Sequence, residues 1–196
     1  MDMLRTGTGF VQSAEILESQ DLLAVRMNAS LKIIDPQFYA NAEKVHDRMN
    51  QENAGARMIG GMDPLVLEGR EYLVNSRAPI HIDKQDTPLG WVGIVALGYF
   101  TGGFIYLASL GLRVRMQPGD CIWLRGRVLT HGVEEWEGTL RISIPHFTHA
   151  SVWRKYGMAD EAGLKPSEPS TPKPKPGTYK PKGSTYKCKA GIKKCT

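Results

Sequence analysis

Two kinds of hydrophobic spacing divide the chain into a helical first third and a strand-rich remainder. The run that opens at Ser13 predicts a helix to about Leu31, with Ser13 as its cap. Asp35-Pro36 predicts a second start, because a capping carboxylate is followed by proline at the first helical position. This second helix should end before Gly55. Its apolar positions recur every three to four residues, at Phe38, Ala42, Val45 and Met49.

From about Leu65 the pattern changes to short apolar runs separated by Gly, Pro and Asp. Residues 113–116 and 140–147 alternate polar with apolar, so each should bury one face. Helices followed by seven or eight short antiparallel strands predict an α+β fold with a β-barrel or jelly-roll core. We expect a helical support region over residues 1–64, packed on one side of a core over residues 65–160. Residues 161–196 should form a Lys/Pro-rich, disordered tail.

Charge is distributed unevenly along the 196 residues, whose formal net charge is +5. Residues 165–196 hold nine Lys and one Glu, a balance of +8, which leaves −3 for residues 1–164. Such a tail is either a solvated segment or an arm for nucleic acid or an acidic partner. It also holds two of the three cysteines, Cys188 and Cys195, which are too few for a structural zinc site.

One long uncharged stretch, Thr87 to Leu112, is long enough to span a bilayer. It contains six glycines and many β-formers, which disfavour a helix, so buried strands are the better interpretation and no membrane association is expected. The N-terminal residues lack the basic-then-apolar order of a signal peptide. We expect a monomer in a nuclear or otherwise intracellular location.

Candidate metal ligands occur at His81-Ile82-Asp83 and at His131. Positions i and i+2 of an extended strand share a face, so His81 and Asp83 could act together, and His131 could complete a set of three from another strand. Two imidazoles and one carboxylate hold iron(II) on one face and leave positions open for chemistry. The competing interpretation is that a lone His-X-Asp pair is simply polar surface.

A candidate anion anchor follows at Arg141, with Ser143 two residues on and facing the same way. A guanidinium holds a carboxylate through two parallel bonds, and a hydroxyl can add a third. Taken alone, this pair is better explained as part of a solvated strand face.

Together these segments resemble the iron(II)- and 2-oxoglutarate-dependent dioxygenases, and more narrowly the TET/JBP branch, which oxidises the methyl group of 5-methylcytosine or thymine in DNA. The sequence is most similar to the small TET-like proteins of protists and fungi. The resemblance extends over roughly Leu65 to Tyr156. The matching elements are Asn75, His81-Ile82-Asp83, the 107–113 segment, Pro118-Gly119-Asp120, the 126–133 segment and Arg141.

The resemblance implies an enzyme that oxidises a base in DNA and so contributes to DNA demethylation. It also implies roles for individual residues. His81, Asp83 and His131 would bind Fe(II), with 2-oxoglutarate and O2 as co-substrates. The distal carboxylate of 2-oxoglutarate would lie on Arg141 and Ser143. Asn75 would contact the co-substrate or the base, although an amide in a turn is an equal alternative.

The same resemblance implies a pocket for a base flipped out of methylated DNA. Phe147 would stack on that base, while Asp86 and His149 would bond its polar edge. The alternatives are a core aromatic for Phe147, a turn-capping carboxylate for Asp86 and an exposed strand end for His149. The tail could contact phosphates. Two other functions remain open: a 2-oxoglutarate oxygenase acting on protein, RNA or a small molecule, and a non-catalytic nucleic-acid-binding β-barrel module.

Overall fold

Four helices open the chain in the computed structural model, which describes residues 7–164. Residues 165–196 of the predicted tail, with its two cysteines, lie outside the described residues. The predicted start of the tail at residue 161 is wrong, because residues 161–164 are folded and Ala162 is fully buried in the core. A short fifth helix follows the last strand. The helices are α1 (Gly7–Ser19), α2 (Asp21–Ile34), α3 (Pro36–Glu52), α4 (Ala54–Gly60) and α5 (Ala150–Lys155).

The start of α3 confirms the capping prediction. The backbone N–H of Phe38 donates to Asp35 Oδ1 at 2.9 Å, and Pro36 occupies the first helical position. The predicted single helix from Ser13 to Leu31 is wrong, because the chain breaks at Gln20 between α1 and α2. Ser13 is no cap: it lies inside α1, and its hydroxyl donates to the Gly9 carbonyl at 2.7 Å.

The break at Gln20 separates two helices that bury different amounts of surface. Helix α1 has no fully buried residue, whereas α2 buries Ala24, Met27 and Leu31 at three- and four-residue spacing. The Gln20 side chain accepts a hydrogen bond from Tyr72 Oη at 2.9 Å. The break therefore lets α2 take the direction that packing against the strands requires, which local helix propensity does not encode.

Within residues 7–164, eight strands form two antiparallel sheets. The major sheet has the order β1-β8-β3-β6, with β2 also paired to β8, and the minor sheet has the order β5-β4-β7. The strands are β1 (Gly69–Arg70), β2 (Leu73–Val74), β3 (Val92–Gly102), β4 (Ile105–Leu107), β5 (Leu112–Val114), β6 (Cys121–Leu124), β7 (His131–Val133) and β8 (Trp136–Phe147).

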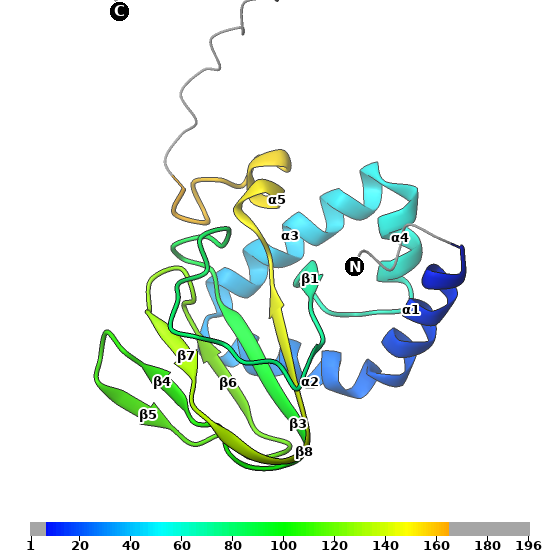
Figure 1. The fold of residues 1–196 in the computed structure, drawn as a ribbon. Helices are drawn as coiled ribbons and strands as arrows, with labels where there is room; N and C mark the ends of the chain where they lie inside the picture. Colours follow the sequence, from blue (N-terminus) through cyan, green and yellow to red (C-terminus); the bar gives the residue numbers. More distant parts are fainter. Residues whose placement is uncertain (1–6, 165–196) are drawn as a thin grey trace, which may run out of the picture. The chain divides into compact units, whose positions relative to one another are not determined.

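The two faces of the major sheet pack against different partners. One face contributes Val95 and Ile144 to a core that includes the buried residues of α2 and α3, and the other contributes Ala96 and Phe100 to a core shared with β4. Figure 1 shows α2 and α3 lying along the major sheet, with β4 and β5 at its other side.

The α+β class is confirmed, with antiparallel sheets and helices. Of the two predicted cores, the closed barrel is wrong, since strand pairing within residues 7–164 ends at separate edges of the two sheets and does not join them into a ring. The jelly roll, or double-stranded β-helix, stays a prediction. Among the described residues, no helix is both long and apolar enough to cross a membrane.

Candidate metal centre

A cavity of about 420 Å³ opens on the face of β8 that turns toward the minor sheet. Alternate residues of β8 line it, as the two-residue period of a strand requires. The opposite wall comes from the segment 78–86 and from the start of β7. The residues used below that line this cavity are His81, Asp83, Asp86, Val92, His131, Ser143, Phe147 and His149.

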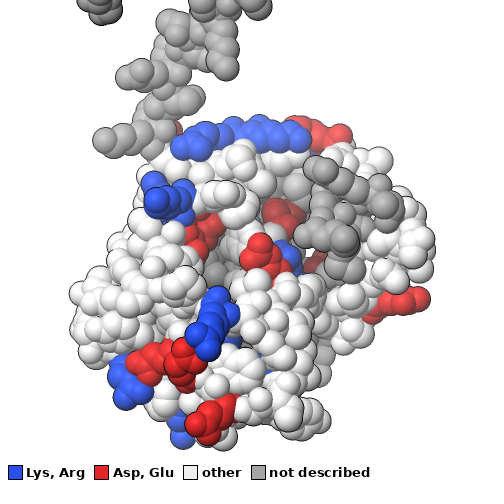
Figure 2. Space-filling model, in the orientation of Figure 1, with Lys and Arg blue, Asp and Glu red and all other residues white. Residues whose placement is uncertain are grey.

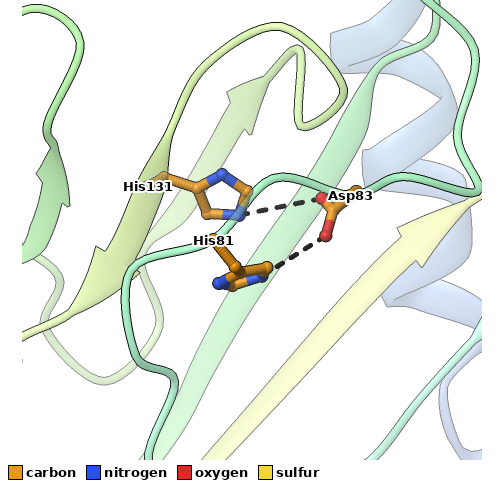
Figure 3. A group of neighbouring side chains, drawn as sticks. All are labelled: His81, Asp83 and His131. Atoms are coloured by element: carbon orange, nitrogen blue, oxygen red, sulfur yellow. Dashed lines mark ion pairs between the residues drawn. The ribbon is translucent and has the colours of Figure 1, made fainter.

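Three of these residues, His81, Asp83 and His131, bring their ligand atoms within 4.8 Å of one another (Figure 3). His81 Nε2 lies 3.3 Å from Asp83 Oδ1, and His131 Nε2 lies 3.7 Å from Asp83 Oδ2. The group could hold a metal ion. The carboxylate thus lies between two imidazoles that come from segments fifty residues apart.

The backbone that carries this group differs from the expected strand end. His81 forms only an isolated antiparallel bridge with His131, and Asp83 follows in irregular backbone. Two backbone hydrogen bonds, of 2.8 and 2.9 Å, join His81 and His131 in both directions. His131 opens β7 and does not close a preceding strand, because residues 126–129 form a turn and a bend.

Both imidazoles are fixed through their Nδ1 atoms. His81 Nδ1 lies 2.7 Å from the Pro79 carbonyl, and His131 Nδ1 lies 2.8 Å from the Leu129 carbonyl, in each case two residues earlier. A carbonyl oxygen only accepts, so Nδ1 carries the proton and the neutral ring presents a bare Nε2 lone pair. This carbonyl-held tautomer is the usual arrangement of metal-binding histidines.

Two Nε2 lone pairs and a carboxylate at these distances repel one another unless a proton or a metal cation lies among them. The donor set of two imidazole nitrogens and one carboxylate suits a divalent transition metal and leaves coordination positions open. On this chemistry, the three residues fit the iron(II) that the sequence predicted.

A buried guanidinium lies deeper beside the same strand face. Arg141 is 3 % exposed, and its Nη1 donates to the Ser143 hydroxyl at 2.5 Å, while its Nε and Nη2 have no partner within residues 7–164. Its guanidinium carbon lies 5.2 Å from the centre of the Phe100 ring. Burial lowers the pKa of this guanidinium from its ordinary value. Ser143 lines the cavity, whereas Arg141 reaches its wall only through Ser143.

An unpaired buried cation is costly, and the two open donors of Arg141 are directed to no group of the described chain. A carboxylate that bonds both donors would remove that cost. The two donors therefore have the chemistry to bond an anion, although Arg141 itself does not line the cavity in this structure.

The three predicted base-contacting residues lie together on the cavity wall. His149 Nδ1 lies 3.0 Å from Asp86 Oδ1, and the rings of Phe147 and His149 are 4.6 Å apart between centroids. Burial raises the pKa of the Asp86 carboxyl, and the His149 bond opposes this rise. Strand β8 ends at Phe147, so His149 is not on the strand as expected but at the N-cap of α5.

Asn75 lies outside the cavity lining and binds the backbone of β8. Its Oδ1 accepts from the Arg141 N–H at 2.8 Å, and its own N–H donates to the Arg141 carbonyl at 2.8 Å. Asn75 has a φ of 50°, a left-handed conformation that Asn tolerates. The structure thus places it where it holds the Arg141 backbone; its predicted contact with a co-substrate or base stays a prediction.

The other two histidines of the core lie away from the metal group. His46 on α3 bonds Glu68 at 2.9 Å. His146 is fully buried, its Nδ1 lies 3.0 Å from the Gly93 carbonyl, and burial lowers its pKa to about 4.

Sequence reasoning missed two charged residues of the cavity wall, Glu71 and Lys84. Neither belongs to a motif that could have marked it.

On the face drawn in Figure 2, basic and acidic side chains alternate with large uncharged areas. The surplus of lysine lies in residues 165–196, outside the described residues.

Comparisons with known proteins identify no family for the chain. No protein-family model and no curated protein matches the sequence. A solved structure of NgTET1 in complex with 5mC DNA is similar at 18% identity, with a TM-score of 0.41. The similarity covers 46% of this chain and 37% of that chain.

Proposed function

We propose that this protein is an Fe(II)- and 2-oxoglutarate-dependent dioxygenase. The observation that carries the proposal is the pair of bare Nε2 atoms that face the Asp83 carboxylate. Iron(II) bound by His81, Asp83 and His131 would supply the oxidising chemistry, with 2-oxoglutarate and O2 as co-substrates. The two sheets around the site would correspond to the double-stranded β-helix core of this class.

Arg141 is the proposed anchor for 2-oxoglutarate. Its two unpartnered donors suit the distal carboxylate, and the Ser143 hydroxyl on the cavity wall can add a bond to the same group. In this role the guanidinium sets the orientation of the co-substrate relative to the metal ligands. Asn75 supports that role by bonding the Arg141 backbone on both sides.

The proposed substrate is a 5-methylpyrimidine base in DNA, 5-methylcytosine or thymine. A cavity of about 420 Å³ can admit one base with the co-substrate but not a duplex, so the base would enter flipped. Asp86 fixes the His149 ring through Nδ1, which leaves Nε2 to bond the polar edge of the base. Phe147 would contact its flat face.

A single-turnover assay tests both levels of the proposal. The anaerobic full-length protein receives iron(II), 2-oxoglutarate and methylated duplex DNA, and oxygen is then admitted. We expect succinate together with oxidised 5-methylcytosine on nucleoside mass spectrometry. Asp83→Ala should abolish both products, and the exposed Asp160→Ala serves as the matched control.

The two products separate the alternatives. Succinate without an oxidised base would refute the DNA substrate and favour an oxygenase acting on protein, RNA or a small molecule. If the Asp83→Ala variant still forms both products, the proposed metal centre is refuted. Absence of both products from a wild-type protein that binds no metal would refute the enzyme altogether.

A further inference from the structure

Gly126 packs directly against the carboxylate of the metal centre. A Cβ atom added at Gly126 would overlap Asp83 Oδ2 and lie 3.0 Å from Asp83 Cγ. It would also lie 3.2 Å from Cγ2 of Val92. The Gly126 carbonyl accepts the Asp83 N–H at 2.9 Å, so the two residues are joined through the backbone as well.

We propose that Gly126 is a positioning residue, whose missing side chain leaves the space in which Asp83 lies between His81 and His131. The inference rests on the proposed metal site. It adds to that site a residue that binds neither metal nor substrate and acts only through Asp83. Any side chain at position 126 would turn the carboxylate away from the two Nε2 atoms.

The glycine is needed for space and not for backbone conformation. Gly126 does not have a positive φ, so alanine can adopt its backbone conformation without strain. Gly98 and Gly138 differ, because there φ is 119° and 137° and an added Cβ would overlap backbone carbonyl oxygens. Those two glycines serve the sheet, whereas Gly126 faces the carboxylate end of the Asp83 side chain.

The backbone at Gly126 is held from both sides, so it cannot easily retreat from an added methyl group. On one side Arg125 pairs with Asp35 at 3.3 Å and lies over the Trp91 ring at 4.6 Å. On the other side Arg127 Nη1 donates to the Lys84 carbonyl at 2.8 Å. The Asp83 carboxylate, which can rotate, is therefore the group that moves.

This reasoning predicts an unusual signature for Gly126→Ala. Because the carboxylate can turn aside, the metal-free protein should lose little stability. Because the turned carboxylate no longer faces both imidazoles, metal affinity should fall by about 10- to 100-fold, the range for groups that orient a metal ligand. A purely structural glycine would show the reverse: lower stability, with metal affinity unchanged in the folded fraction.

The test measures Co(II) binding by calorimetry and urea unfolding of the metal-free, full-length protein. Gly61→Ala is the matched control, since its added Cβ would meet its nearest atom at 3.5 Å, an ordinary contact. We expect both variants to unfold at the wild-type midpoint and only Gly126→Ala to bind Co(II) more weakly. Wild-type Co(II) affinity in Gly126→Ala would overturn the inference and leave the proposed function standing.

Two further outcomes are decisive. If the wild type binds no Co(II), the proposed metal site fails, and this inference fails with it. If Gly126→Ala lowers stability, the same substitution in an Asp83→Ala chain identifies the cause. A loss that disappears in that background places the overlap at the carboxylate and supports the inference, whereas a loss that persists overturns it.

Discussion

Arg141→Met should weaken binding of the co-substrate and stabilise the empty protein at the same time. The guanidinium is 3 % exposed, and two of its nitrogens have no partner among the described residues. If that site exists to receive a carboxylate, it is unfavourable when empty. Methionine keeps the apolar stem of the side chain as far as about the position of Nε and removes the charge.

The magnitude follows from the partners of Arg141. Each unsatisfied buried donor costs about 2 kcal/mol, so the two together cost about 4 kcal/mol. The substitution also removes the bond to Ser143, which contributes about 1.5 kcal/mol, and the contact with Phe100, which contributes about 1.5 kcal/mol. The net gain is about 1 kcal/mol, which should raise Tm by about 2–4 °C in a protein of this size. Ser143 can then bond water in the cavity that it lines.

Binding of 2-oxoglutarate should change in the opposite direction. Two charge-assisted bonds of at least about 1.5 kcal/mol each are lost, so Kd should rise by at least about 100-fold. Calorimetry with saturating Co(II) measures this, and thermal unfolding without ligands measures the stability gain. Arg113→Met is the control, because Arg113 is exposed and bonds Glu134 outside the cavity. An unchanged Kd, or a Tm below that of the wild type, would refute the assignment of Arg141 as an anion anchor.

Three further predictions follow from single contacts. Gly69→Ala should impair oxidation of the substrate and spare Co(II) affinity, because its Cβ would overlap the Phe147 ring; equal loss of both would contradict separate roles. His146 takes up a proton near pH 4 when folded but near pH 6.5 when unfolded, so stability should fall by about 2 kcal/mol from pH 7 to pH 5. Urea unfolding should show a shallower fall for His146→Asn; identical slopes would exclude His146 as the cause. Asp35→Ala removes the α3 cap and should cost at least about 1 kcal/mol in the same assay, whereas an unchanged midpoint would discount the cap.

Local signals predicted the parts of the fold that depend on neighbouring residues. Asp35-Pro36 predicted a helix start, because the capping carboxylate bonds a backbone N–H only three residues further on. The structure contains this bond. The break at Gln20 was missed because it is related to the packing of α2 against the sheet. The sheet residues in that core lie far from α2 in the sequence. A β-barrel or jelly roll was predicted from the order and number of the strands, and these do not determine whether two sheets join.

In the candidate site too, local patterns identified some residues, and long-range contacts determined the others. Histidine and carboxylate at two-residue spacing could be recognised from the sequence, and the fold brings His131 to them through a bridge that no local pattern announces. The contacts of Asn75 with Arg141 and of Gly126 with Asp83 span 66 and 43 positions, so no periodicity could reveal them. Position 126 also has no polar group that would have drawn attention to it.

The charges of the site suggest why the metal group and Arg141 belong to one function. Two neutral imidazoles and Asp83 carry −1 together, and a divalent cation changes this to +1. The proposed dicarboxylate co-substrate would bring −2, and Arg141 brings +1, so the three metal ligands, Arg141 and the two bound groups would together be neutral. Each ligand alone leaves charge in a partly buried cavity, where it is costly. Metal and dicarboxylate should therefore favour each other's binding, which neither a structural metal site nor an isolated anion pocket would require.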